Sequence, residues 1–192
     1  MKIYRICCSD IENHLQNIIT NWYDFVNNHS PIVELFYQVL IENSTYINKL
    51  LNLTQALEVF SHNFRDKNNL QIIKKKIKIE NYVVKHEKSS SVTLFHKIYD
   101  LLDHAKDFFG LDDVQAENIS CAISNARNYY THYTKDKSKI ISQEEVLLIG
   151  RFLTYFLRLL IIEKIGVPMA VIKQKLYDRE CNEIVELIKK YK

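Results

Sequence analysis

The chain has 192 residues, 47% of them hydrophobic, and a formal net charge of +3 at pH 7. It contains only 3 Gly and 2 Pro, and this scarcity of turn-forming residues argues against a β-sandwich or a barrel. None of the four cysteines has metal-ligand spacing, which argues against a zinc site. We therefore expect reduced thiols in a cytoplasmic protein, with residues 1–192 forming one domain.

Two helices are predicted in the N-terminal part of the chain, residues 1–44. Ser9 and Glu12 have the spacing of a helix capping box, which predicts an amphipathic helix from there to about Asn28. Ser30-Pro31 predicts the start of the next helix, because proline is favoured at the first helical position.

The rest of the chain, residues 45–192, is predicted to form the core. Apolar side chains recur at helical spacing over residues 46–64, which predicts a third helix. Residues 66–91 break this pattern: they contain the basic run Lys74-Lys75-Lys76 and are predicted to form a less regular insertion. These lysines could contact an RNA backbone or could keep an exposed loop soluble, and both interpretations stay open.

Further helices are predicted after this insertion. One covers residues 92–109, where a glycine follows it, and the next covers residues 113–133. Ser142 forms a capping box with the glutamate three residues later and opens a very apolar helix that ends near Gly166. A last amphipathic helix is predicted over residues 168–190.

These elements predict an all-α protein, a helical bundle of about six to seven helices with a basic insertion at residues 66–91. The very apolar helix carries two arginines within its longest apolar stretch, so it is predicted to be buried rather than to span a membrane. No membrane association, metal ion or other cofactor is expected.

The helix predicted over residues 113–133 carries the most informative segment, Arg127-Asn128-Tyr129-Tyr130-Thr131-His132. At about 100° per residue, its core stripe is predicted to hold Ile119, Ala122, Ile123, Ala126, Tyr130 and Tyr133. The outward face is predicted to hold Cys121, Ser124, Asn125, Asn128 and His132. From residue 118 to 134 the only formal charge is Arg127, and such an uncharged face favours contact with a partner subunit or a substrate.

The motif side chains suit the cleavage of RNA by its own 2′-hydroxyl group, which requires no metal ion. A histidine such as His132 can act as general acid or base in this reaction. Arg127 can stabilise the phosphate charge through a bidentate fork, and Asn128 can hold a phosphate oxygen or orient the histidine. A plainer interpretation stays open, in which His132 interacts only with the helix dipole and Arg127 pairs with a surface carboxylate.

The same residues resemble the motif of the HEPN superfamily, in which an arginine and a polar residue precede a histidine near the end of a bundle helix. Here the motif is Arg127-Asn128-x3-His132, within a context similar to the ApeA-like HEPN domains of bacterial anti-phage and abortive-infection proteins. The likeness also rests on Leu57-Glu58-Val59-Phe60-Ser61-His62 and on the apolar helix that closes on Lys164-Ile165-Gly166-Val167. ApeA-like proteins usually carry a large N-terminal domain before this part, for which 192 residues leave no room, so a stand-alone HEPN protein, a partner-regulated toxin and a fragment all stay open.

The resemblance implies a four-helix core and a metal-independent endoribonuclease that acts as a homodimer, with the motif helices of two subunits forming a composite cleft. Arg127 would bind the scissile phosphate, His132 would act as general base or acid, and Asn128 would support either group. The expected products are a 2′,3′-cyclic phosphate end and a 5′-hydroxyl end. The substrate would be RNA, with tRNA as one candidate, in anti-phage defence or as a toxin under a regulatory partner protein.

Other side chains are candidates for a site. Tyr129 lies inside the motif and could stack on a base or pack against the protein. Arg151 and Arg158 share one stripe of the apolar helix, where they could hold phosphates or pair with acids such as Glu144 and Glu163. His62 lies one turn after Glu58, a spacing that also occurs in ordinary pairs on helix surfaces.

Two other functions stay open. The domain could be a non-catalytic HEPN-like module whose polar face serves only dimerisation or docking. It could also be the partner subunit of a nucleotidyltransferase, although the chain contains no Gly-rich phosphate loop of its own.

Overall fold

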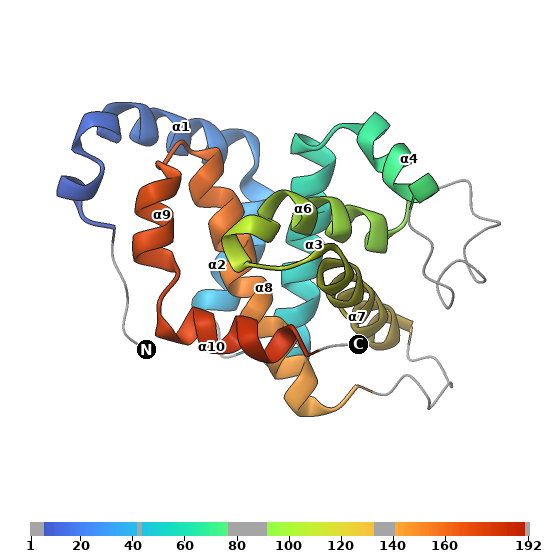
Figure 1. Cartoon of the computed structure of the whole chain (residues 1–192). Helices are drawn as coiled ribbons and strands as arrows, with labels where there is room; N and C mark the ends of the chain where they lie inside the picture. Colours follow the sequence, from blue (N-terminus) through green and yellow to red (C-terminus); the bar gives the residue numbers. More distant parts are fainter. Residues whose placement is uncertain (1–5, 42–43, 77–91, 133–140, 191–192) are drawn as a thin grey trace.

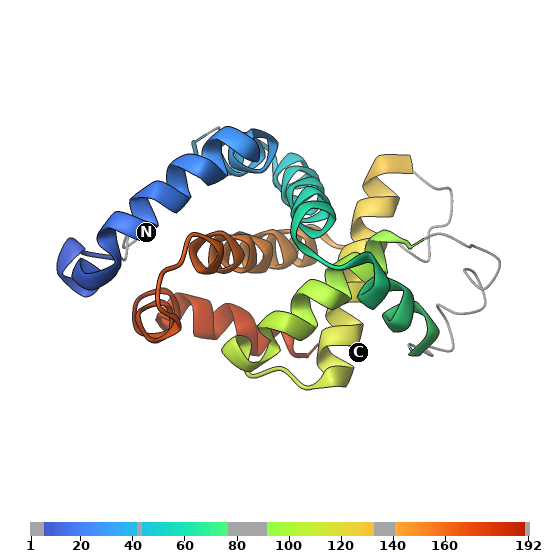
Figure 2. The same cartoon turned by 90° about the horizontal axis from the view of Figure 1, so that it is seen from above.

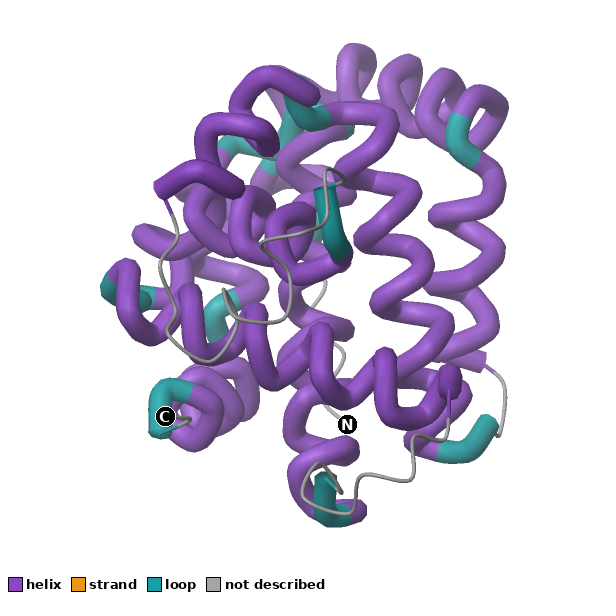
Figure 3. The backbone as a smooth tube through the Cα atoms, turned by 90° about the vertical axis from the view of Figure 1, so that its right-hand side faces the viewer, coloured by secondary structure: helices purple, strands orange, loops and turns teal. Residues whose placement is uncertain are grey.

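The computed structural model describes residues 6–41, 44–76, 92–132 and 141–190. Every regular element in these residues is a helix, and Figure 3 shows no strand among them. The α-helices are α1 (Leu15–Asn28), α2 (Ser30–Ile41), α3 (Tyr46–Phe64), α4 (Lys67–Lys76), α6 (Leu94–Phe109), α7 (Asp113–His132), α8 (Gln143–Lys164), α9 (Met169–Leu176) and α10 (Arg179–Ile188). The all-α prediction is therefore confirmed.

Helices α3 and α8 lie side by side at the centre of the molecule (Figure 1 and Figure 2). The longest helices are α3, α6, α7 and α8, with 19, 16, 20 and 22 residues. Helix α3 contacts the other three, and α6 also packs against α7. One cluster of buried apolar side chains extends from Ile18 in α1 to Ile188 in α10. In the described part of the chain, no helix combines the length and the apolar character needed to cross a membrane.

Local signals in the sequence correctly mark the ends of two core helices. Oγ of Ser142 accepts a hydrogen bond from the backbone N–H of Glu145 at 3.2 Å, and Oε2 of Glu145 accepts one from the N–H of Ser142 at 2.8 Å. The predicted capping box at the start of α8 is therefore confirmed. At the end of α6, Gly110 adopts a φ of 61°, the left-handed conformation that terminates many helices.

The start of the first helix differs from the prediction. Ser9 and Glu12 do not form the expected capping box; instead the backbone N–H of Cys7 donates to the carboxylate of Asp10 at 2.8 Å. This bond closes a tighter turn, and two short 3₁₀ helices (Cys8–Asp10 and Glu12–His14) follow. The regular helix α1 therefore begins only at Leu15.

The described residues contain nine α-helices, whereas the sequence predicted about six to seven. The helix predicted over residues 168–190 is in fact divided into α9 and α10. The division has a local cause, because the side chain of Asp178 accepts a hydrogen bond from the backbone N–H of Cys181 at 2.7 Å and caps a new helix.

Another helix, α4, occupies the first part of the insertion that was predicted to be less regular. A side-chain oxygen of Asp66 accepts a hydrogen bond from the N–H of Asn68 at 2.9 Å at its start. Leu70 is buried, and α4 packs against α6, so tertiary contact stabilises a helix that is otherwise polar. The remainder of the predicted insertion, residues 77–91, lies outside the described residues.

Candidate active site

The Arg-Asn-His motif lies at the C-terminal end of α7. Just before this helix, a carboxylate oxygen of Asp112 accepts a hydrogen bond from the N–H of Gln115 at 2.7 Å, and the side-chain oxygen of Gln115 accepts one from the N–H of Asp112 at 3.0 Å. This reciprocal pair satisfies backbone donors that the start of a helix leaves without partners. Helix α7 then packs against α3 and α6, which fixes the direction of its side chains (Figure 1).

The buried side of α7 is wider than its apolar pattern predicts. It consists of Ala116, Ile119, Ser120, Ile123, Ser124 and Ala126. The prediction that Ser124 faces outward is therefore wrong, since this residue is only 1% exposed. A serine can line a core when its hydroxyl bonds to the helix backbone, as Oγ of Ser120 does by donating to the carbonyl of Ala116 at 2.7 Å.

The other positions predicted for α7 divide between core and surface. Ala122 and Tyr130 are half-buried and pack against the core, whereas Tyr133 lies outside the described residues. On the outward side, Cys121, Asn125 and Asn128 are half-buried and His132 is exposed. The accessible side of the helix therefore still carries the polar motif residues.

Arg127 is held at the surface between α7 and α3 by two contacts. One guanidinium nitrogen donates to the side-chain oxygen of Asn128 at 3.3 Å, and another lies 3.4 Å from a carboxylate oxygen of Glu58. The Arg127 side chain is 30% exposed, so part of its donor edge faces solvent. Glu58 is thus a carboxylate partner of the kind expected if Arg127 has only a structural role. The contact with Asn128 also keeps two residues of the motif together.

Glu58 connects Arg127 to a second cation. Its other carboxylate oxygen accepts a hydrogen bond from Nζ of Lys97 on α6 at 3.0 Å. Two cations share one carboxylate, so this cluster of Arg127, Glu58 and Lys97 retains a net positive charge that suits a phosphate group. Sequence reasoning did not identify Lys97, and it paired Glu58 with His62; the actual partners of Glu58 are 39 and 69 positions away in the chain.

His132 is the last residue of α7 and is exposed. It follows Asn128 by about one helical turn, so the two side chains leave the same side of the helix. The hydroxyl of Thr131 donates to the carbonyl of Arg127 at 2.8 Å, which satisfies a carbonyl in the last turn. The imidazole of His132 is therefore accessible to a substrate or to a second copy of the chain.

Two predicted RNA contacts lie on neighbouring elements. Tyr129 is half-buried, and its ring meets that of Tyr130 edge to face, with 5.0 Å between the ring centroids. The lysines 74–76 form the last three positions of α4, which packs against α6, the helix that carries Lys97. Tyr129 belongs to the motif helix itself, and contact of Tyr129 and of these lysines with RNA stays a prediction.

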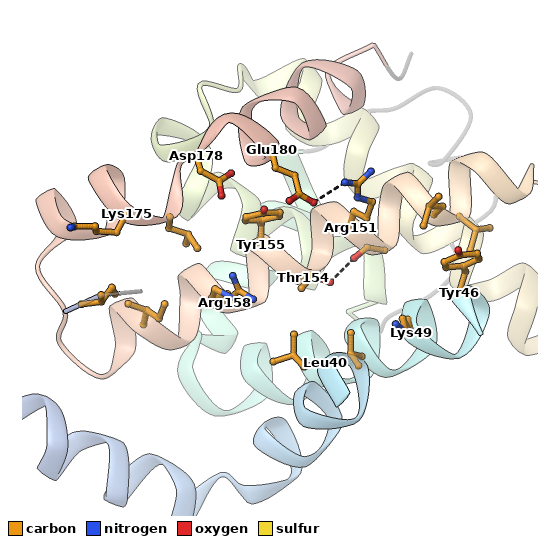
Figure 4. Close-up of a pocket in the computed structure, with 17 residues that line it drawn as sticks. Leu40, Tyr46, Lys49, Arg151, Thr154, Tyr155, Arg158, Lys175, Asp178 and Glu180 are labelled. Atoms are coloured by element: carbon orange, nitrogen blue, oxygen red, sulfur yellow. Dashed lines mark hydrogen bonds and ion pairs between the residues drawn. The ribbon is translucent and has the colours of Figure 1, made fainter. Parts of the chain in front are cut away.

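Arg151 and Arg158 do not join the motif. They line a cavity of about 460 Å³ between α8, the α2–α3 pair and the α9–α10 pair (Figure 4), and no residue of α7 lines it. Arg151 donates to the carboxylate of Glu180 at 2.7 Å, and the guanidinium of Arg158 lies 5.8 Å from the centre of the Tyr155 ring. A tertiary arrangement, which sequence spacing does not reveal, places them in a separate cavity.

A smaller cavity of about 200 Å³ lies beside Lys97 and is lined by further basic side chains, including His62, Arg65 and Lys67. The charge of Arg65 is compensated by the buried carboxylate of Asp100, at 2.5 and 3.0 Å. This bond raises the pKa of Arg65 above its ordinary value. Asp100 thus compensates the charge of Arg65, and Lys67 is the further lysine that lines this cavity with Lys97.

The segment that contains this site was compared with models of known protein families, and one of them matches. The family model described as Apea-like HEPN matches residues 51–171. The matched segment contains α6, α7 and α8 and most of α3, and therefore includes Glu58, Lys97 and the Arg-Asn-His motif. Neither the curated proteins nor the solved structures give a match.

Proposed function

Because the chain belongs to the Apea-like HEPN family, we propose that it is an endoribonuclease that cleaves RNA by attack of a 2′-hydroxyl on the neighbouring phosphorus, without a metal ion. The observation that carries this proposal is the contact of Arg127 with Asn128, about one turn before an exposed His132. We place this activity in the cytoplasm, in anti-phage defence or as a toxin.

The proposed step is an internal transfer at phosphorus. A neutral His132 takes the proton of the 2′-hydroxyl, the 2′-oxygen bonds to phosphorus, and the bond to the 5′-oxygen breaks. The leaving oxygen receives a proton from an imidazolium, which gives a 2′,3′-cyclic phosphate and a 5′-hydroxyl. Arg127 stabilises the negative charge that builds on the phosphate oxygens, while Asn128 orients the guanidinium.

A homodimer through α7 would supply both proton-transfer groups, one His132 from each copy. The outward side of α7 supports this arrangement because its residues Cys121, Asn125 and Asn128 are half-buried and uncharged. Helix faces that stay in water usually carry Lys and Glu, whereas neutral polar faces suit a self-complementary contact. The positive cluster of Arg127, Glu58 and Lys97 would then border the cleft.

The decisive experiment is cleavage of labelled single-stranded RNA and tRNA by the purified protein in excess EDTA. Arg127→Ala and His132→Ala should each lower the rate at least about 100-fold, the usual contribution of a phosphate-stabilising or proton-transfer group. Exposed residues of the same types, in Arg179→Ala and His14→Ala, serve as matched controls and should cleave at the wild-type rate.

Mapping of the RNA ends and of the oligomeric state completes this test. Wild-type products should carry 2′,3′-cyclic phosphate and 5′-hydroxyl ends, and light scattering should show a dimer for both inactive variants. RNA cleavage that survives both substitutions would overturn the proposed function.

One observation favours a second candidate, a non-catalytic docking module: the pairing of Arg127 with Glu58 is also what a purely structural arginine would show. In that case no RNA is cleaved, and Asn125→Ala or Asn128→Ala changes the oligomeric state instead. Expression in cells separates the two candidates, because only a ribonuclease makes the wild type toxic while His132→Ala is harmless.

A further inference from the structure

The smaller cavity, of about 200 Å³, lies where α3, α4 and the start of α6 meet. Helix α4 follows the end of α3 along the chain and packs against α6 (Figure 1). The residues that line the cavity come from the last two turns of α3, the first two turns of α4 and the N-terminal part of α6. One water molecule occupies about 30 Å³ in the liquid, so this volume accommodates a phosphate group with a few waters.

The charge of the cavity lining favours an anion. Among the described residues that line it there is no carboxylate, whereas three, Arg65, Lys67 and Lys97, carry a permanent positive charge. The carboxylate of Asp100 compensates Arg65. Lys67 is exposed and has no carboxylate within ion-pair distance in the described part of the chain. Lys67 therefore supplies positive charge that no described group neutralises.

Ser61 adds a hydroxyl that lacks a hydrogen-bond partner among the described residues. This residue of α3 lines the cavity and is 0% exposed. Other buried hydroxyls in the helices donate to the carbonyl one turn earlier, as Thr54 does at 3.0 Å and Ser120 at 2.7 Å. A buried polar group without a partner is unfavourable. An oxygen atom bound in the cavity would satisfy the hydroxyl of Ser61.

Lys97 connects this cavity to the motif. Its side chain lines the cavity, and its Nζ donates to a carboxylate oxygen of Glu58 at 3.0 Å. The other oxygen of the same carboxylate lies 3.4 Å from Arg127. His62 and Arg65, at the cavity, follow Glu58 by one and two helical turns, so they share its stripe of α3. A strand held by Arg127 therefore meets the cavity next if it runs along this stripe.

From these features we propose that the cavity is a second phosphate site, which holds the phosphate next to the one that is cut in the same RNA strand. Lys67 and Lys97 attract this phosphate, and the hydroxyl of Ser61 donates to one of its oxygens. The inference rests on the proposed cleavage of RNA and deepens it, because it makes a strand with at least two phosphates the preferred substrate.

DNA strands that contain a single ribonucleotide test this proposal, because only one bond in each can be cut. The shortest substrate has one phosphate, and two longer ones have one more phosphate on the 5′ or the 3′ side. For one of the longer substrates the wild type should show a KM at least about fivefold lower at a similar kcat. Lys67→Gln should abolish this difference and Lys67→Arg should retain it, while Lys173→Gln, an exposed lysine of α9, is the matched control.

A binding measurement separates the second phosphate site from catalysis. Fluorescence anisotropy reports binding of the preferred longer strand to His132→Ala, which requires no cleavage. Addition of Lys67→Gln or Ser61→Ala to this variant should weaken binding at least about threefold. Lys67→Gln should also reduce the slope of log affinity against log salt concentration by about 0.7, the contribution of one phosphate contact in a single strand. Circular dichroism verifies that each variant is folded.

The outcomes distinguish this proposal from the proposed function. Equal KM values for all three substrates, or unchanged binding after Lys67→Gln or Ser61→Ala, would overturn the second phosphate site even if the wild type cuts RNA. Absence of cleavage by the wild type would overturn the proposed function instead. The binding measurement would then still decide whether the cavity holds a phosphate of the strand.

Discussion

At the scale of single residues, Glu58 determines how much positive charge a phosphate meets at the motif. Its two carboxylate oxygens contact Lys97 at 3.0 Å and Arg127 at 3.4 Å, and its side chain is 25% exposed. A phosphate that approaches Arg127 therefore competes with a carboxylate that is already in place. The same carboxylate also prevents repulsion between the two cations when no substrate is bound.

We predict that Glu58→Gln lowers the KM for RNA about two- to fivefold, because partly exposed ion pairs contribute about 0.5–1 kcal/mol. Glutamine retains an oxygen that can accept from Arg127, so kcat should not fall. Steady-state kinetics measure both constants, and the exposed Glu34→Gln on α2 is the control. A fall in kcat at unchanged KM would instead mean that the charge of Glu58 positions Arg127.

The residues of the site differ in how far the sequence could predict them. The shared outward side of Asn128 and His132 follows from helical spacing within one segment. Lys97 has no such signal, since it reaches the site through the packing of α6 on α3. Ser124 was misplaced because polarity is a poor guide to burial for a side chain as small as serine.

At the scale of elements, two glycines should respond in opposite ways to the same substitution. Gly110→Ala should destabilise the protein by about 1 kcal/mol, because Gly110 has a φ of 61° that disfavours any side chain. Gly150→Ala should stabilise it by up to about 1 kcal/mol, because this position is helical and has open space around a Cβ. Urea unfolding measures both changes, and equal signs would contradict the assignment of the two positions.

A buried ion pair joins the end of α3 to α6. Arg65 donates to both carboxylate oxygens of Asp100, whose side chain is 3% exposed. Asp100→Asn should lower the free energy of unfolding by about 2 kcal/mol, since a charged acceptor of two bonds is lost. The exposed Asp107→Asn on the same helix should have little effect. An identical urea midpoint for the two variants would show that the pair contributes nothing.

Helix boundaries were predictable where a local signal stands alone, as at Ser142 and Gly110. The break between α9 and α10 was missed because the apolar pattern continues across it, while the Asp178 side chain caps a new helix. Helix α4 was missed because its polar sequence depends on contact with α6 for stability. The apolar pattern thus predicted one continuous helix, whereas the hydrogen bond accepted by Asp178 divides it into α9 and α10.

At the scale of the whole molecule, the burial of three tyrosines makes the free energy of unfolding depend on pH in the alkaline range. Burial is the first cause that raises the pKa of Tyr99, Tyr155 and Tyr177 above the ordinary value of 10.0. These hydroxyls lose their protons more readily in the unfolded chain, so the stability they contribute is present below about pH 10 and is lost as the pH rises through the higher folded values.

We therefore expect the melting temperature to fall steadily above about pH 10, with the part of the phenolate absorbance that comes from these three tyrosines appearing only on unfolding. Tyr155→Phe should show a smaller fall, since one of the three groups no longer ionises. Complete ionisation of all three tyrosines in the folded protein, at their ordinary pKa, would contradict this account.

The central position of α3 has a practical consequence for separating the motif from the larger cavity. Lys49 at the larger cavity and Glu58 at the motif are about two and a half turns apart along this helix, and therefore project from opposite sides of it. Helix α3 thus separates the two sites, and each of its two sides contributes a charged side chain to one of them. Substitutions in α7 act on the motif, and substitutions in α8 that line the larger cavity act on that cavity, so variants of these two helices can be used to change one site at a time.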